Sequence, residues 1–218
     1  MDITGPPEVI VVAGGMPPTV EISRPAGAFV IAADRGVVLA EQLGLSIDVA
    51  LGDWDSTPPD VLDRLHDLAP DVREHPADKD ATDLELALDA ALDRSPARVL
   101  VLGIEGGRPD HALANLLVAS APRFAALDIE LVLDHGHAWA VHDRLVGRRP
   151  AGETVSVLPV HGGATVSIAG VRWPLDRARL DAGTTWGVSN ETTGGPLSLT
   201  VHDGTAYLII PRPQETPA

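Results

Sequence analysis

The sequence contains no cysteine, which excludes disulfide bonds and thiolate metal ligands. It also lacks any apolar run near the roughly 20 residues that a membrane-spanning helix requires. Residues 1–5 carry neither the basic start nor the apolar stretch of a secretory signal peptide. We therefore expect the protein to remain in the cytoplasm.

Basic residues are scarce, since 16 of them stand against 31 acidic residues and leave a net charge of −15. Such a balance argues against a surface that follows the phosphates of a nucleic acid. An acidic protein can still bind a nucleotide where metal ions offset its carboxylates. Lys79 is the only lysine in the chain, and it lies inside an acidic cluster.

The first 135 residues repeat one pattern, in which a short apolar strand ends in glycine or aspartate and an amphipathic helix follows. This alternation predicts a parallel α/β sheet covered by helices on both faces. Strands are expected at 9–13, 29–33, 48–51, 98–102 and 129–133. Helices are expected around 35–43, 59–68, 82–93 and 110–119, with proline in the first turn of some of them.

After about residue 150 the pattern changes to alternating strands separated by glycine and proline. Antiparallel strands are expected at 154–159, 164–169, 197–201 and 206–210, while 139–148 is ambiguous and fits a strand leading out of the first domain. A length of 218 residues suits two small domains. The sequence therefore predicts an α/β domain over residues 1–148 and an antiparallel β-sandwich over residues 149–218.

Acidic residues follow the predicted strands, at the sheet edge where ligands of parallel sheets collect. Asp34 follows the second strand, and Asp53 and Asp55 follow the third. Two carboxylates spaced in this way can face one side and hold Mg²⁺, which prefers hard oxygen ligands. The alternative is an ordinary turn, because aspartate and serine also favour turns and helix caps.

A second acidic cluster runs from Lys79 to Glu85. Thr82 followed by Glu85 is typical of a capping box at the start of a helix. That explanation leaves Lys79, Asp80 and Asp83 unexplained in the same turn. A lone lysine suits a site that needs a compact positive charge against a phosphate, although chance also explains a single residue.

A glycine-rich turn follows the strand expected at 98–102. Gly106-Gly107-Arg108 precedes a helix that begins with Pro109, and this arrangement predicts an anion site built from backbone N–H groups and a guanidinium. Asp110 and His111 fall in the first helical turn, and Asn115 lies one turn further on the face of His111. Alternatively, Asp110 only interacts favourably with the helix dipole, and His111 is a buried, hydrogen-bonded residue.

Other motifs argue against other classes of protein. Gly14-Gly15 lacks the glycine spacing of a dinucleotide fold, and the chain has no P-loop and no nucleophile elbow. His135 and His137 lack further ligands at a spacing that suits zinc.

Together these segments resemble the thiamine pyrophosphokinase family. The resemblance covers roughly residues 8–211 and rests on blocks that match in order and spacing: residues 33–36, GDWDS at 52–56, KDATDLELAL at 79–88, GGRPDHALANL at 106–116, GVRWPL at 170–175 and GVSNE at 187–191. The family has an N-terminal α/β domain and a C-terminal β-sandwich. Its members work as homodimers with two sites at the subunit interface.

The resemblance also implies roles for individual residues. Asp53, Asp55 and Asp83 would hold Mg²⁺, while Lys79, Arg108 and Asp110 would contact the ATP phosphates or their metal. The same blocks assign further residues to nucleotide binding: Asp34, Asp80, Thr82, Gly107, His111 and Asn115. Ser189 and Asn190 would meet thiamine from the partner subunit. The chain departs from the family in having Trp54 in place of phenylalanine and no aromatic residue directly after Asn190, which leaves Trp186 as a candidate stacking partner.

The implied reaction is in-line attack of the thiamine hydroxyl on the β-phosphorus of ATP, which gives thiamine diphosphate and AMP. Catalysis would come from positioning and charge neutralisation, with Asp83 or Asp55 able to accept the hydroxyl proton. Competing interpretations are a pyrophosphokinase for another alcohol such as a pterin, a non-catalytic nucleotide-binding module and a Mg²⁺-dependent phosphohydrolase. The Ser189-Asn190 block favours thiamine, and the presence of every acidic cluster argues against the non-catalytic module.

Overall fold

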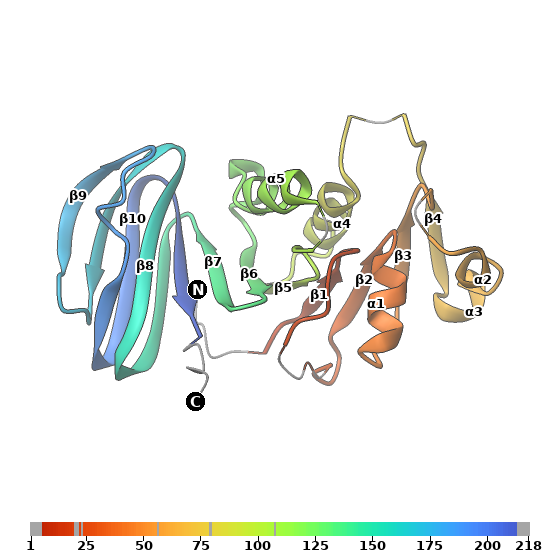
Figure 1. Cartoon of the computed structure of the whole chain (residues 1–218), viewed down its shortest axis with the longest axis horizontal. Helices are drawn as coiled ribbons and strands as arrows, with labels where there is room; N and C mark the ends of the chain where they lie inside the picture. Colours follow the sequence, from red (N-terminus) through yellow and green to blue (C-terminus); the bar gives the residue numbers. More distant parts are fainter. Residues whose placement is uncertain are drawn as a thin grey trace. The chain divides into compact units, whose positions relative to one another are not determined.

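The structure is a computed structural model that describes residues 6–19, 22, 24–55, 57–78, 80–106 and 108–212 of the chain. It divides into two compact units (Figure 1). We call the unit built from Pro6–Ala119 and Leu131–Asp134 the α/β unit. The unit built from Ser120–Glu130 and the described residues from His135 onward is called the β unit.

The α/β unit contains a parallel sheet in the order β4-β3-β2-β1-β5. Its strands are β1 (Val9–Val12), β2 (Phe29–Ala33), β3 (Val49–Gly52), β4 (Asp71–Glu74) and β5 (Arg98–Leu102). Val12 at the end of β1 pairs with Ala32 on one side and with Leu102 on the other. The carboxyl ends of β1, β2 and β5 therefore lie side by side.

Helices cover both faces of this sheet. They are α1 (Gly36–Gln42), α2 (Pro59–Leu62), α3 (Leu65–Leu68), α4 (Asp83–Leu92) and α5 (Pro109–Ala119). Val37 of α1 packs with Ile10 and Val30 in a buried core. The alternate residues Val11 and Ile31 are also fully buried, because α4 packs against β1 and β2.

Two expectations for this unit were wrong. The helix expected over 59–68 is two short helices, α2 and α3, which are interrupted at Asp63 and Arg64. The strand β4 was not expected, because its sequence is DVRE and two of its residues are exposed. It pairs only with β3 at the end of the strand order, and an edge strand does not need apolar residues on both faces.

The β unit is built from antiparallel strands in the order β7-β10-β8-β9, preceded by the 3₁₀ helix η1 (Pro122–Phe124). Its strands are β7 (Gly136–Val141), β8 (Arg144–Ala169), β9 (Leu175–Asp181) and β10 (Asn190–Pro211). Residue numbers fall along β8 as they rise along β10, and Leu199 pairs with both Leu145 and Ile168. Strand β6 (Asp128–Leu133) contributes residues to both units.

The fold class expected from the sequence is confirmed, with parallel α/β structure followed by antiparallel strands. The separate strands expected at 154–159 and 164–169 are parts of β8, and those at 197–201 and 206–210 are parts of β10. The strand β9 was missed because its sequence, LDRARLD, is largely charged. In the described part of the chain, no helix combines the length and the apolar character needed to cross a membrane.

Gly36 at the start of α1 tests how tightly the helix meets the sheet. A Cβ atom added at Gly36 would lie 1.9 Å from the carbonyl oxygen of Val12, which belongs to the buried strand β1 and cannot move aside. We expect Gly36→Ala to lower the free energy of unfolding by about 3 kcal/mol or more, measured by urea denaturation.

Gly27→Ala is the matched control, because Gly27 has a positive φ of 81° but no atom within 4 Å of the added Cβ. It should lose only the roughly 1–2 kcal/mol of a left-handed backbone. Equal losses in the two variants would contradict the close contact at Gly36.

Candidate functional site

A cleft of about 680 Å³ lies in the α/β unit at the carboxyl ends of its strands. Loops that follow β1, β2, β3 and β5 line it, together with the first turns of α4 and α5. The residues that the sequence assigned to a site and that line this cleft are Asp34, Asp53, Asp55, Thr82, Asp83, Arg108, His111 and Asn115. Segments that are far apart in the sequence thus meet at one sheet edge, as expected for a parallel sheet.

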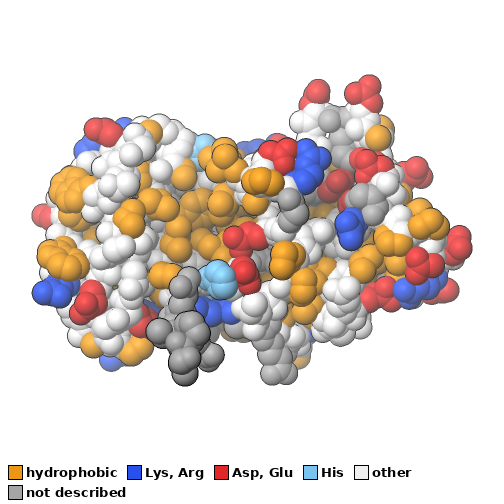
Figure 2. All heavy atoms as spheres, in the orientation of Figure 1, with side chains coloured by type: hydrophobic (Ala, Val, Ile, Leu, Met, Phe, Trp, Pro, Cys, Tyr) orange, Lys and Arg blue, Asp and Glu red, His pale blue; other side chains and the backbone are white. Residues whose placement is uncertain are grey.

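Three of these residues converge as a group of carboxylates. Asp34, Asp53 and Asp55 each offer an oxygen atom, and these atoms lie within 4.8 Å of one another. Aspartate and glutamate side chains also gather over α2, α3 and β4 on the face seen in Figure 2, where they are mostly exposed. Unlike that surface, the Asp34-Asp53-Asp55 cluster lines a cleft and directs its oxygens toward one point.

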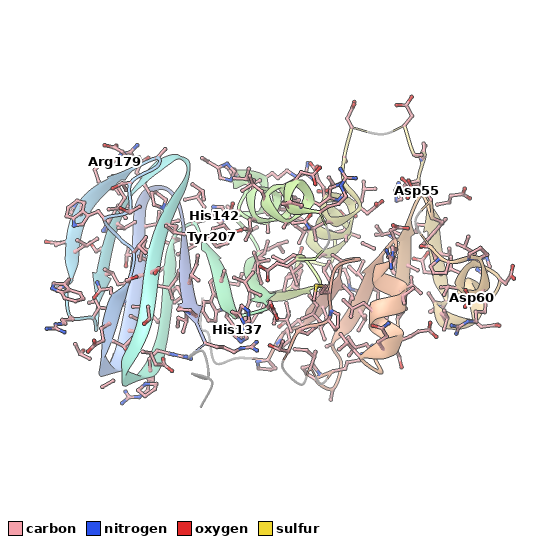
Figure 3. The ribbon with its side chains drawn as sticks, in the orientation of Figure 1. Asp55, Asp60, His137, His142, Arg179 and Tyr207 are labelled. Carbon is pink, nitrogen blue, oxygen red and sulfur yellow. The ribbon has the colours of Figure 1, made fainter. Side chains whose placement is uncertain are left out.

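The turn after β3 explains why Asp53 and Asp55 face the same side. Trp54 between them has a left-handed backbone with φ of 63°, and the Asp55 N–H donates a hydrogen bond to Asp53 Oδ1 at 3.2 Å. The Trp54 side chain packs against the core, which offsets the strain of this conformation. Asp55 lies beyond the end of β3 (Figure 3).

Two hydrogen bonds hold Asp34 in place. It is 8% exposed, has a left-handed backbone with φ of 46°, and accepts a hydrogen bond from Thr57 Oγ1 at 2.8 Å. Its N–H donates to the carbonyl of Leu51 in β3. The sequence assigned Asp34 to nucleotide binding and gave the metal to Asp53, Asp55 and Asp83. The structure brings Asp34 to the first two, and Asp83 lines the same cleft.

Repulsion among these carboxylates shifts the titration of Asp55. The negative charge of Asp53 is the main cause that raises the pKa of Asp55, followed by loss of hydration and by the charges of Asp34 and, more weakly, Asp83. A crowded set of oxygen donors of this kind suits a hard divalent cation, whose charge removes the repulsion.

The start of α4 combines a structural and a site residue. Thr82 is the N-cap of this helix, and its Oγ1 accepts a hydrogen bond from the Glu85 N–H at 3.2 Å, so the N-cap expected from the sequence is confirmed. Asp83 begins the helix. Asp80 is exposed and is not among the residues that line the cleft. Lys79 lies outside the described residues.

At the start of α5, Arg108 and Asp110 pair with each other. Arg108 Nη2 lies 2.6 Å from Asp110 Oδ2, and both side chains are exposed. Hydrogen bonding from Arg108 is the main cause that lowers the pKa of Asp110 to about 2. Arg108 lines the cleft, whereas Asp110 does not and contacts Arg108. Gly107 lies outside the described residues.

Asn115, one turn further along α5, braces the wall of the cleft. Its Nδ2 donates a hydrogen bond to the carbonyl of Ile104 at 3.0 Å, in the loop that follows β5. Gly15 packs on the same loop: its N–H donates to Gly103, and an added Cβ would lie 2.2 Å from the carbonyl of Glu105. The sequence had shown Gly14-Gly15 only as a mismatch to a dinucleotide fold. A glycine pair directly after a buried strand was the signal for this close approach.

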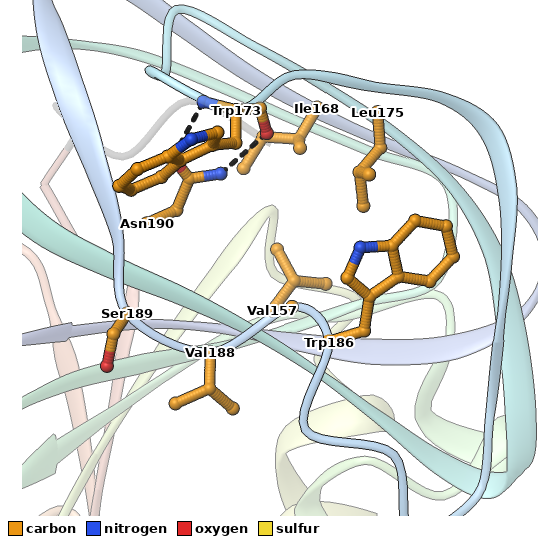
Figure 4. A pocket seen from close by; sticks show the side chains of 9 residues that line it. Val157, Ile168, Trp173, Leu175, Trp186, Val188, Ser189 and Asn190 are labelled. Atoms are coloured by element: carbon orange, nitrogen blue, oxygen red, sulfur yellow. Dashed lines mark hydrogen bonds between the residues drawn. The ribbon is translucent and has the colours of Figure 1, made fainter.

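A second pocket, of about 410 Å³, lies in the β unit. We call it the tryptophan pocket, because Trp173 and Trp186 line it together with Val157, Ser189 and Asn190 (Figure 4). The indoles are unusually exposed for their type, at 55% for Trp173 and 63% for Trp186.

The sequence predicted Ser189, Asn190 and Trp186 for this pocket, and all of them line it. It did not single out Trp173, although the block at 170–175 contained it. Asn190 accepts a hydrogen bond from the Trp173 N–H and donates one to the Trp173 carbonyl. These two residues are 17 positions apart, so no local sequence pattern indicates that they pair.

Comparison with known proteins finds two family models, both of thiamin pyrophosphokinase domains, that match this chain. The family model of the thiamin pyrophosphokinase catalytic domain matches residues 25–132, and that of the thiamin pyrophosphokinase vitamin B1 binding domain matches residues 143–205. Thiamine pyrophosphokinase of Bacillus subtilis is 30% identical over 167 residues, which cover 74% of this chain and 77% of that protein.

Solved structures agree with the sequence matches. A thiamin pyrophosphokinase family protein from Enterococcus faecalis superimposes with a TM-score of 0.81 and 25% identity, covering 95% of this chain and all of that one. The B. subtilis enzyme superimposes with a TM-score of 0.79 and 26% identity, covering 94% of this chain and 99% of that one. The chain therefore belongs to the thiamine pyrophosphokinase family.

Proposed function

We propose that this chain is a thiamine pyrophosphokinase, which transfers a diphosphate group from ATP to the hydroxyl of thiamine and releases AMP. One observation carries the proposal above the others. The catalytic-domain match contains most of the residues that line the acidic cleft, and the vitamin B1 binding match contains all that line the tryptophan pocket. Each kind of substrate thus has a pocket of suitable chemistry in the matching unit.

Mg²⁺ is the metal we assign to the cleft. The cluster of Asp34, Asp53 and Asp55 supplies carboxylate oxygens within reach of one ion, and Asp83 lines the same cleft. A bound Mg²⁺ neutralises charge on phosphate oxygens. The carboxylates themselves fix where the diphosphate group can bind, because they repel any phosphate that lacks a compensating cation.

The cations of the chain complete the phosphate site in this proposal. Arg108 presents a guanidinium at the cleft, and its pairing with Asp110 fixes the orientation of its donors. His111 and Asn115 line the cleft on the same helix. From the sequence alone, Lys79 supplies a second, compact charge against the phosphates.

Thiamine is assigned to the tryptophan pocket. Its two flat rings, one of them a cation, suit exposed indoles, because aromatic faces attract both flat rings and positive charge. A pterin is also flat, so the pocket by itself does not distinguish thiamine from a pterin. The vitamin B1 binding match over residues 143–205 favours thiamine.

We further propose a division of labour, an assembly and a location. Residues 1–148 handle the nucleotide and metal, and residues 149–218 bind thiamine and form a homodimer. The family resemblance supports sites that each combine the α/β unit of one chain with the β unit of its partner. We also propose that the protein acts in the cytoplasm.

The direct test is incubation of the protein with ATP, Mg²⁺ and thiamine, followed by mass detection of thiamine diphosphate and AMP. A phosphohydrolase would release phosphate or AMP without thiamine, and a non-catalytic module would consume no ATP. Parallel incubation with a hydroxymethyl pterin separates the two pyrophosphokinases. Absence of thiamine diphosphate would refute the proposed function.

Asp53→Asn and Asp55→Asn should each nearly abolish turnover while leaving the fold intact. Each removes an oxygen ligand at the end of β3 rather than core packing. We expect kcat to fall by about 100-fold or more, which corresponds to roughly 3 kcal/mol of transition-state stabilisation. Initial rates at saturating Mg²⁺ measure the effect, and near-native rates in either variant would show that the metal assignment is wrong.

The same cluster predicts that Asp55→Asn, although it lowers activity, raises the stability of the protein when no metal is bound. Because the pKa of Asp55 is raised in the folded protein, the fold binds that proton more tightly than the unfolded chain, and the ionised carboxylate opposes folding. Metal-free Asp55→Asn should therefore melt at a higher temperature than the wild type at neutral pH. Mg²⁺ should raise the melting temperature of the wild type but not of the variant.

Asp67→Asn is the matched control for this melting experiment, since Asp67 is an exposed carboxylate on α3, away from the cleft. It should keep the full Mg²⁺ response. A Mg²⁺ response in Asp55→Asn as large as in the wild type would place the ion elsewhere.

The proposed dimer predicts complementation between inactive chains. An Asp53→Asn chain and a Trp173→Ala/Trp186→Ala chain should recover activity when co-expressed, because one of the two sites in each hybrid dimer has both pockets intact. Thiamine diphosphate formation by purified heterodimers, carrying a different tag on each chain, measures the recovery. Inactive heterodimers would show that each site is built within a single chain.

A further inference from the structure

We propose that Asn190 is a positioning residue, whose side-chain amide holds the main chain of Trp173 and so fixes one wall of the tryptophan pocket. The family resemblance had suggested instead that Asn190 meets thiamine directly. The identity of the ligand rests on the proposed function, whereas the anchoring of Trp173 can be tested in the free protein.

The proposal begins with a short backbone pairing that ends beside the pocket. Val171 and Thr192 form an antiparallel bridge, and the Thr193 N–H donates to the Gly170 carbonyl at 3.0 Å. The Arg172 N–H donates to the Glu191 carbonyl at 2.8 Å. Continued by two residues, this pairing would place Trp173 opposite the backbone at position 190.

The backbone does not continue in that way, because Ser189 has a left-handed conformation with φ of 60°. The Asn190 side chain takes its place. The Trp173 N–H donates to Asn190 Oδ1 at 3.1 Å, and Asn190 Nδ2 donates to the Trp173 carbonyl at 2.7 Å (Figure 4). A side-chain amide carries a donor and an acceptor in one plane, as a peptide group does, so it extends the pairing by one step.

Most of the hydrogen-bonding capacity of the Asn190 amide is used within the protein, since Nδ2 donates one bond and Oδ1 accepts from the Trp173 N–H. Oδ1 also accepts a hydrogen bond from the Glu191 N–H at 2.9 Å, so both of its lone pairs are used. Displacing these bonds for a ligand would leave main-chain groups of Trp173 without their partners. The atoms of Asn190 are thus better suited to holding the wall than to binding the ligand.

Trp173 depends on such an anchor because little else fixes it. More than half of its side chain is exposed, and Arg172 lies over its ring at 4.8 Å. Pro174 follows and lacks an N–H to add to the pairing.

The wall formed by Trp186 has a separate anchor, which provides a matched control. The Gly187 carbonyl accepts a hydrogen bond from the Val157 N–H at 2.8 Å, and the Ser189 N–H donates to Ser156 Oγ at 3.0 Å. Ser156→Ala removes the hydrogen bond to the Ser189 N–H and deletes neither of the hydrogen bonds between Asn190 and Trp173.

The first experiment uses the free protein labelled with 5-fluorotryptophan, whose four tryptophans give separate ¹⁹F resonances assigned by single Trp→Phe variants. Asn190→Ala should shift or broaden the Trp173 resonance and leave that of Trp139 unchanged. Ser156→Ala should affect Trp186 instead. Asn190→Asp, which loses the donor, keeps the acceptor and adds a negative charge, is the second variant if Asn190→Ala melts below the working temperature. An unmoved Trp173 resonance in a folded Asn190 variant would overturn the proposal.

The second experiment is a double-mutant cycle on the kinetics with thiamine. Asn190→Ala should raise KM for thiamine about tenfold with kcat nearly unchanged at saturating thiamine, the pattern of lost ground-state binding. In a Trp173→Ala background the same substitution should change KM by less than about twofold, because its effect passes through Trp173.

The two experiments separate the possible failures. An equal rise of KM in both backgrounds would mean that Asn190 contacts thiamine itself and would overturn the positioning role. If the wild type forms no thiamine diphosphate, the proposed function fails, while the ¹⁹F comparison still decides whether Asn190 anchors Trp173.

Discussion

The mutual repulsion of Asp34, Asp53 and Asp55 is the constraint that the rest of the α/β unit must overcome to keep these carboxylates together. Like charges this close separate unless a rigid framework holds them. The framework is the parallel sheet, in which the ends of β2 and β3 are adjacent and fully buried strands cannot shift register without exposing apolar residues. Left-handed backbone at Asp34 and Trp54 then aims the carboxylates, and Thr57 and the core contacts of Trp54 hold that strain. The stability of the sheet thus keeps an unfavourable cluster of carboxylates in place, in the arrangement that the proposed cation site requires.

Both pockets use the same local device. In the cleft, Asp53 lies beside a left-handed residue, Trp54, and its side chain accepts a backbone N–H two residues on. In the tryptophan pocket, Asn190 lies beside a left-handed residue, Ser189, and its side chain takes over main-chain pairing. Aspartate and asparagine suit this task because their short side chains place oxygen within reach of nearby backbone. In each case the turned backbone presents side chains to a ligand, and the short polar side chain keeps the turn in one conformation.

The sequence predicted those features of the fold that a local pattern of residues determines. Apolar strands such as β1 and β2, the cap at Thr82 and the proline at the start of α5 were found because each is encoded within a few residues. The edge strand β4 and the charged strand β9 escaped because their partners, rather than their own residues, make them strands. In the site, the spacing of Asp53 and Asp55 was informative, whereas the approach of Asp34, the pairing of Arg108 with Asp110 and the hold of Asn190 on Trp173 depend on tertiary contacts or side-chain conformation. Such contacts bring together residues that a linear pattern cannot relate.

The net charge of −15 acts in opposite directions on the two proposed substrates. An acidic protein attracts the thiamine cation and repels free ATP at a distance, and salt weakens both effects. The tryptophan pocket needs no carboxylate of its own among its lining residues to favour a cation, because the field of the chain and the faces of the indoles act in the same direction. The cleft faces the opposite problem: its carboxylates exclude a bare polyphosphate and admit one that arrives with divalent cations. In the proposed function, selection for metal-bound nucleotide would therefore follow from the charge of the cleft before any specific contact is made.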